Sequence, residues 1–189
     1  MMPPRPTELA WMLLRGAIRA GDLVIDATAG NGYDTVFLAG CVGESGRVIA
    51  FDVQEAAIRS ARSRVVAAGL DSRVDFHHAS HAGMAAHAAA ESVSVVMFNL
   101  GYLPGEDHGL TTQAWETLTA MEEAASLLKP GGVLSVVCYP GHAEGAEEAA
   151  RVEEWLCARA SSGWRVAKYG MPATLRPAPF LLLAAKNER

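Results

Sequence analysis

Short apolar segments that are typical of buried strands alternate with longer segments that are typical of helices along most of this chain. The expected strands cover 23–27, 47–51, 73–77, 93–99 and 133–139, and two more lie near 165–170 and 180–185. The expected helices cover 7–20, 54–69, 112–128 and 144–160, with one ending near 41 and another near 90. This alternation favours a parallel sheet that is covered by helices on both faces. The last two strands have no helix between them, so we expect an antiparallel ribbon at one edge.

Length and composition agree with one α/β domain. The chain has 189 residues, of which half are hydrophobic and a fifth are charged, so there is little room for a second core. We expect a single domain over 1–189, with the helix in 1–20 packed on it through Leu9, Met12, Leu13 and Ile18. The fold class is α/β and Rossmann-like, a seven-stranded, mostly parallel sheet with an antiparallel edge strand and helices on both faces.

The sequence shows no membrane segment and no disulfide framework. Its longest apolar runs, such as 93–100 and 179–185, are far too short to span a bilayer, and no apolar signal region stands at the N-terminus. Cys41, Cys138 and Cys157 are odd in number, widely scattered and without metal-ligand spacing. We therefore expect a cytoplasmic protein with no metal and no membrane partner. The net charge of −5 argues against a broad electrostatic grip on nucleic acid and leaves a local basic patch open.

A glycine loop follows the first expected strand. It reads Asp26-Ala-Thr-Ala-Gly-Asn-Gly32, and the glycines allow the backbone to turn sharply and approach a ligand. The next helix presents its free N–H groups there. Asp52 ends the second strand about twenty residues further on, where a carboxylate can accept both hydroxyls of a ribose. The pattern predicts an adenosyl cofactor at the carboxyl ends of the strands.

Two details favour S-adenosylmethionine over a dinucleotide. The dinucleotide fingerprint wants a third glycine where this chain has Thr35. Asp26 and Asp34 would repel a pyrophosphate, whereas they suit the ammonium and sulfonium of S-adenosylmethionine. A nicotinamide cofactor, or a glycine turn in which Asp26 only caps the helix, remains the alternative.

Several motifs resemble the YtqB/MnmM-like family, long labelled putative rRNA methylases, and the resemblance covers nearly the whole chain. The most specific match is Phe98-Asn-Leu-Gly-Tyr-Leu-Pro-Gly105. The other matching segments are 21–35, 51–58, Ser80-His81, Thr111-Thr112, 128–132, 139–142 and 179–182. The chain departs from the pattern at Ala79, where an acid is common, and at 174–179, where the family is usually Asn-rich.

The resemblance implies a class I S-adenosylmethionine-dependent methyltransferase. It also implies a tRNA substrate bound at the anticodon region, with methylation of the aminomethyl nitrogen of wobble uridine 34. An rRNA or small-molecule methyltransferase, and a non-catalytic S-adenosylmethionine-binding module, remain the alternatives. A homodimer is compatible with the sequence.

Asn99 ends the fourth strand, which lies beside the cofactor's methyl group in this fold. Its side-chain carbonyl can hold an amine so that the nitrogen lone pair points at the methyl group. The amine must be neutral, and with a lysine-like pKa of ~10 its deprotonation at pH 7 costs roughly 4 kcal/mol. His108 and His142 are candidate bases because each lies on a loop after a central strand.

The candidate residues fall into three groups. We expect Asn99, Tyr102 and His142 to be catalytic. The expected cofactor contacts are Asp26, Thr28, Gly30, Asn31, Gly32, Asp34, Asp52, Val53, Gln54, Ser80, His81, Asn99 and Leu100. The expected substrate contacts are Gly101, Tyr102, Leu103, Pro104, His108, Tyr139, His142 and Arg176.

Further residues are candidates for RNA contact or for covalent attack. Tyr102 and Tyr139 are candidates for stacking on a flipped base. Basic residues that are candidates for phosphate contacts are Arg15, Arg19, Arg165, Lys168 and Arg176. Cys138 lies in an apolar strand and is expected to pack rather than to attack a pyrimidine ring.

Overall fold

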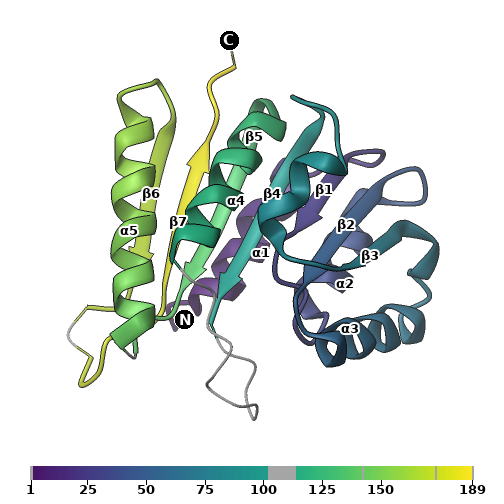
Figure 1. The fold of residues 1–189 in the computed structure, drawn as a ribbon, viewed down its shortest axis with the longest axis horizontal. Helices are drawn as coiled ribbons and strands as arrows, with labels where there is room; N and C mark the ends of the chain where they lie inside the picture. Colours follow the sequence, from purple (N-terminus) through teal and green to yellow (C-terminus); the bar gives the residue numbers. More distant parts are fainter. Residues whose placement is uncertain (1, 102–113, 142, 173, 189) are drawn as a thin grey trace.

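In a computed structural model, the chain folds around one seven-stranded sheet with the order β3-β2-β1-β4-β5-β7-β6 (Figure 1). The structure describes residues 2–101, 114–141, 143–172 and 174–188. The strands are β1 (Leu23–Asp26), β2 (Arg47–Asp52), β3 (Val74–His78), β4 (Val93–Leu100), β5 (Leu128–Cys138), β6 (Arg165–Gly170) and β7 (Phe180–Ala185). All expected strands are present, which confirms the predicted fold class.

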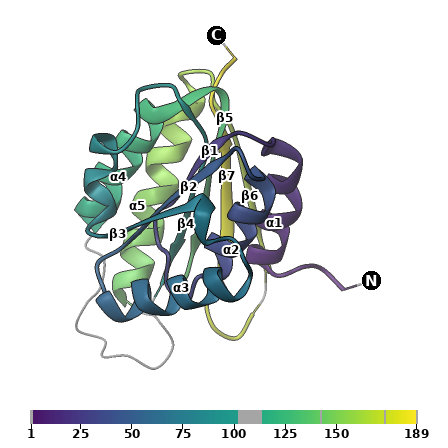
Figure 2. The ribbon, with the colours of Figure 1, turned by 90° about the vertical axis from the view of Figure 1, so that its right-hand side faces the viewer.

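Helices cover both faces of the sheet (Figure 2). On one face, α1 (Pro6–Ala17), α2 (Tyr33–Val42) and α3 (Glu55–Ala67) share a buried apolar cluster with the strands. On the other face, α4 (Ala114–Leu127) and α5 (Ala143–Ala160) form a second cluster. The apolar run of β4 serves both, since Val95 and Met97 face the first cluster while Val96 and Phe98 face the second. Among the described residues, no helix is long and apolar enough to cross a membrane.

The antiparallel ribbon lies at one edge of the sheet, as predicted. β7 pairs antiparallel with β6, and it also pairs antiparallel with β5, so that it stands between them. The other neighbouring pairs, β1 with β2, β1 with β4, β2 with β3 and β4 with β5, are parallel. The sheet is therefore parallel through its centre and mixed at one end.

The expected helix ending near 90 is wrong. This segment holds only a short 3-10 helix, η2 (His81–Ala86), in which Gly83 has a non-helical backbone with φ −114° and ψ 16°. Alanine favours helix intrinsically, but a helix in a protein is stabilised mainly by burying an apolar face. Between residues 81 and 90 only His81 and Met84 are buried, so the segment has too little apolar surface to hold an α-helix.

The inner face of α1 also differs from the prediction. Met12 and Leu13 are exposed, whereas Ala10 and Leu14 are fully buried. Ile18, just after the helix, is buried as expected. The helix is thus rotated so that an i, i+4 pair faces the sheet, and Trp11 lies beside that pair.

The expected turn at 129–132 lies inside β5. Val93 pairs with Leu128 and Val95 pairs with Val133, so four residues of β5 stand opposite Ser94. Gly131 has φ +76°, a value that favours glycine at this break in the ladder.

Candidate active site

A cavity of about 1200 Å³ opens at the carboxyl ends of the central strands. The chain runs outward from β1 to β2 and β3 and then returns to β4 beside β1, so the strand order reverses between β1 and β4. Ligands of open α/β sheets bind at this kind of reversal. The cavity is lined by Arg5, Thr7, Trp11, Ala27, Thr28, Ala29, Gly30, Asn31, Tyr33, Asp34, Asp52, Val53, Gln54, Ala79, Ser80, His81, Asn99, Gly101, Glu116, Tyr139, Gly141, Pro177 and Pro179.

The glycine loop forms one wall of this cavity. Gly30 and Gly32 have φ +49° and +80°, and a Cβ added at Gly32 would lie 2.5 Å from the Cα of Ala61 in α3. The loop therefore packs backbone to backbone against α3, and only glycine allows this approach. Gly32 is also the residue before the first turn of α2, whose free N–H groups begin at this point.

Asp26 supports the loop from behind. It is completely buried, its Oδ2 accepts a hydrogen bond of 2.6 Å from Thr35 Oγ1, and its Oδ1 accepts one of 3.2 Å from the Thr28 amide. Burial, together with the nearby charge of Asp34, raises the pKa of this carboxyl. Asp26 does not line the cavity, so the geometry gives it the role of fixing the loop.

Asp52 presents a fixed carboxylate at the end of β2. Its Oδ2 accepts the Gly30 amide at 2.9 Å and its Oδ1 accepts the Gln54 amide at 2.9 Å. Each oxygen keeps a further lone pair, so the carboxylate can still accept two hydroxyl groups. Gln54 Oε1 is buried without a partner among the described residues, which leaves an acceptor beside this carboxylate.

Ser80 and His81 also line the cavity. His81 Nδ1 lies 2.9 Å from the Ala27 carbonyl, so Nδ1 carries the proton and Nε2 is an acceptor. Burial lowers the pKa of His81, which keeps the ring neutral. Nε2 is buried without a partner in the described part of the chain, as expected of a group that receives a ligand's N–H. Glu116 of α4 lies beside Ser80, 3.4 Å from its Oγ, and so brings an acid next to the Ser-His pair.

Asn99 lies where β4 opens into the cavity, and Thr28 and Asp34 hold it. Its backbone amide donates to Thr28 Oγ1 at 2.7 Å, and its Nδ2 donates to Asp34 Oδ2 at 3.1 Å. Tyr139, after β5, packs against Gly101, where an added Cβ would lie 3.0 Å from the ring. Burial and the charge of Asp34 raise the pKa of Tyr139, so its hydroxyl stays protonated. The end of β4 is therefore enclosed by polar groups.

The structure brings most of the candidate residues together. Twelve of them line the cavity, namely Thr28, Gly30, Asn31, Asp34, Asp52, Val53, Gln54, Ser80, His81, Asn99, Gly101 and Tyr139. Gly32 and Leu100 pack behind it, and Arg176 is exposed outside it. Five others lie outside the described residues: Tyr102, Leu103, Pro104, His108 and His142.

Sequence reasoning missed several cavity residues. Arg5, Thr7 and Trp11 come from α1 and the residue before it, and Glu116 comes from α4. No motif marks them, because they reach the cavity only through the packing of these helices. The apolar spacing of 7–20 predicts a helix in this region. Trp11, three residues before Leu14, was the signal in this helix that could have marked a cavity residue.

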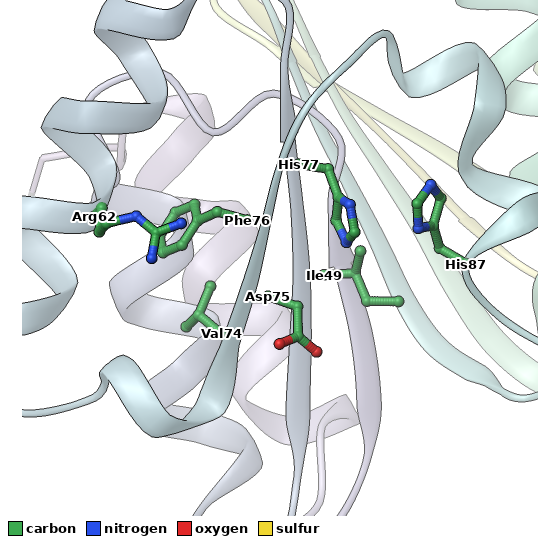
Figure 3. A pocket seen from close by; sticks show the side chains of 7 residues that line it. All are labelled: Ile49, Arg62, Val74, Asp75, Phe76, His77 and His87. Carbon is green, nitrogen blue, oxygen red and sulfur yellow. The ribbon is translucent and has the colours of Figure 1, made fainter.

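A second hollow, of about 480 Å³, lies on the outer strand β3, and none of the candidate site residues lines it (Figure 3). His77 and His87 lie there with ring centroids 4.1 Å apart, and burial lowers the pKa of His77. No group of three or more His, Cys, Asp or Glu among the described residues is placed to hold a metal ion. Cys138 is buried, and burial raises the pKa of its thiol to about 12, which agrees with the expected packing role.

Comparison with known proteins decides the family. The model of the family described as "Putative rRNA methylase" matches residues 48–185. The chain belongs to this family. It is a methyltransferase, and S-adenosylmethionine is the methyl donor that its glycine loop and Asp52 fit. The resemblance stated from the motifs is thereby confirmed.

Relatives of this methylase cover nearly its whole length. A chloroplastic tRNA (mnm(5)s(2)U34)-methyltransferase of Arabidopsis thaliana is 37% identical over 97% of this chain and 70% of the relative. The crystal structure of a putative rRNA methylase from Clostridium thermocellum is 34% identical, with a TM-score of 0.94 over 98% of this chain and 100% of that one. A putative methyltransferase from Streptococcus mutans, solved in complex with SAH, is 31% identical, with a TM-score of 0.88 over 98% and 99%.

Proposed function

We propose that this chain transfers a methyl group from S-adenosylmethionine to the aminomethyl nitrogen of wobble uridine 34 in tRNA. The observation that carries the proposal is the Arabidopsis relative, which bears this activity in its name and aligns with 97% of the chain. The site itself supports the same reaction class, because a glycine loop, a ribose-type carboxylate and an amide meet in one cavity. A cytoplasmic location, binding at the anticodon region and a homodimer stay part of the proposal.

The residues present fit the cofactor. Asp52 would accept the ribose hydroxyls, and His81 Nε2 and Gln54 Oε1 are buried acceptors that wait for donors such as an adenine amino group. The first turn of α2 offers N–H groups for a carboxylate. S-adenosylmethionine supplies a methyl group on a sulfonium, which is already activated. The protein therefore has to position the acceptor rather than activate the donor.

Asn99 is the residue suited to hold the acceptor amine. Its Oδ1 is buried and has no partner among the described residues, so it can accept one N–H of a neutral amine. Holding that N–H fixes the direction of the nitrogen lone pair. His108 and His142, the candidate bases, lie outside the described residues, and their role stays a prediction.

The rim of the cavity offers a contact for RNA. The guanidinium of Arg64 lies 3.7 Å from the centre of the Tyr33 ring, and its Nε donates to the Asn31 carbonyl at 2.7 Å. Tyr33 is 57% exposed and lines the cavity. A fixed aromatic ring beside a cation is suited to stack on an unpaired base. Of the basic residues named from the sequence, Lys168 is bound to Glu153 and none lines the cavity.

A transfer assay tests the proposal. The protein is incubated with cofactor labelled in its methyl group and with aminomethyl-bearing tRNA, unmodified tRNA or rRNA, and each RNA is digested to nucleosides. We expect label in 5-methylaminomethyl-2-thiouridine only. Label in rRNA would replace the proposed substrate with the rRNA alternative. Cofactor binding without label in any RNA would point to a non-catalytic binding module.

A further inference from the structure

Trp11 of α1 lines the same cavity as Asp34 and Asn99. Its Nε1 donates a hydrogen bond of 2.6 Å to Asp34 Oδ1. Its ring is stacked on Phe37 of α2, with centroids 5.2 Å apart and an interplanar angle of 8°. The stack fixes the indole, and the indole N–H is a donor that cannot accept. Oδ1 of the Asp34 carboxylate is thus held by a residue of α1.

The other oxygen of Asp34 holds Asn99. An ionised carboxylate only accepts hydrogen bonds, so Asn99 must turn its Nδ2 toward Asp34 Oδ2, 3.1 Å away. This fixes the orientation of the amide and leaves Oδ1 as an acceptor without a partner in the described part of the chain. A protonated Asp34 would be able to donate instead, and the amide would then be free to turn over and present its NH₂ group.

We propose that Trp11 is a positioning residue for methyl transfer, which holds Asp34 as an oriented carboxylate and thereby sets the Asn99 amide with its oxygen toward the acceptor amine. The inference rests on the proposed function for the identity of the amine. It gives α1 a part in the site beyond packing, because the helix carries the first member of the series Trp11–Asp34–Asn99.

Several groups act on the Asp34 carboxylate. Burial raises the pKa of Asp34 above its usual value, and the hydrogen bonds from Trp11 and Asn99 oppose this rise. Asp26 of β1 interacts with Asp34 through its charge, and Asp52 of β2 acts in turn on Asp26. Tyr139, after β5, faces Asp34 as a neutral hydroxyl.

Arg5, before α1, also lines the cavity, but its guanidinium is bound to Glu8. Trp11 and Asn99 are the two side-chain donors that favour the ionised form of Asp34. Loss of the Trp11 N–H removes one of them, so the pKa of Asp34 must rise.

Two substitutions with matched chemistry test the role. Trp11→Phe keeps an aromatic ring on Phe37 and removes only the N–H. Trp155→Phe removes the same type of bond at a distant place, since Trp155 Nε1 donates to Glu122 Oε1 at 2.7 Å. In the pH profile of kcat/KM, we expect the acid limb of Trp11→Phe to move to higher pH and kcat at neutral pH to fall about tenfold. The Trp155→Phe profile should match the wild type, with thermal melting as the check on folding for both.

A spectroscopic readout makes the inference independent of activity. The chain has four tryptophans, so ¹⁵N-labelled protein gives four indole N–H signals, and Trp11→Phe identifies that of Trp11. We expect this signal to lie downfield and to titrate with pH, and to lose its titration in Asp34→Asn. An indole signal that does not titrate, or an unmoved acid limb in folded Trp11→Phe, overturns the inference. A titrating indole in a protein that fails to methylate aminomethyl-bearing tRNA overturns the proposed function and leaves the positioning role of Trp11 standing.

Discussion

Replacing Gly32 with alanine should damage the loop and the stability of the protein together. The added methyl group would lie 2.5 Å from the Cα and 3.0 Å from the Cβ of Ala61. A residue with a Cβ also loses roughly 1–2 kcal/mol at a positive φ, and Gly32 has φ +80°. Forcing a methyl group into a packed contact costs about 1–3 kcal/mol more. We expect a loss of about 2–5 kcal/mol in the free energy of unfolding.

Urea unfolding measures this loss, and the matched control is Gly40→Ala in α2, the helix that follows Gly32. An added Cβ at Gly40 has nothing within 4 Å, so alanine there should stabilise the helix by roughly 0.5–1 kcal/mol. Gly32→Ala should also weaken cofactor binding in calorimetry, because the loop must move away from α3 to admit the methyl group.

A Gly32→Ala protein that unfolds within about 0.5 kcal/mol of the wild type, below the size of a typical packing defect, would refute the close approach of the loop to α3. A stability loss with unchanged cofactor affinity would refute the link between that approach and binding.

Three further predictions concern single residues. Asp52→Ala should weaken cofactor binding at least tenfold in calorimetry, since hydrogen bonds to a charged group contribute about 1.5–3 kcal/mol each. Asn99→Ala should slow methyl transfer, while its affinity for the cofactor stays nearly the same. An equal loss of cofactor affinity in both variants would contradict the assignment of Asp52 to the cofactor and of Asn99 to the acceptor amine. Cys138→Ala should retain methyl transfer, because a thiol with a pKa of about 12 is no nucleophile. A folded but inactive variant would favour attack of Cys138 on a pyrimidine ring instead. Burial lowers the pKa of His81 in the folded state, so stability should fall as pH drops through the unfolded value of about 6.5, and His81→Gln should flatten this dependence in thermal melts.

Local sequence signals located the central strands and the loop. The apolar run 93–100 predicts a strand because burial on both faces requires apolar residues. The segment Asp26–Gly32 predicts a turn because a backbone at positive φ favours glycine. Local sequence signals predicted the wrong structure where secondary structure depends on packing against other elements. The alanines of 79–90 favour a helix by themselves, and only the shortage of buried side chains shows why none forms.

The division of roles within the site was also beyond the sequence. Asp34 was predicted only as a cofactor contact; it lines the cavity, and its carboxylate also accepts hydrogen bonds from Trp11 and Asn99. Both contacts join residues far apart in the chain, and no local spacing encodes them. Glu116 reaches Ser80 in the same way, through the packing of α4.

The place of β7 has a consequence for how the molecule assembles. This strand follows β6 in the chain, yet it stands between β5 and β6 in the sheet. A nascent chain that has emerged only as far as β6 therefore exposes the whole edge of β5 from Val133 to Cys138, the residues that β7 later pairs. An apolar edge of this kind invites pairing with other chains. Until β7 arrives, β6 lacks the strand with which it pairs in the described sheet, and chaperone binding during synthesis should be concentrated in this interval.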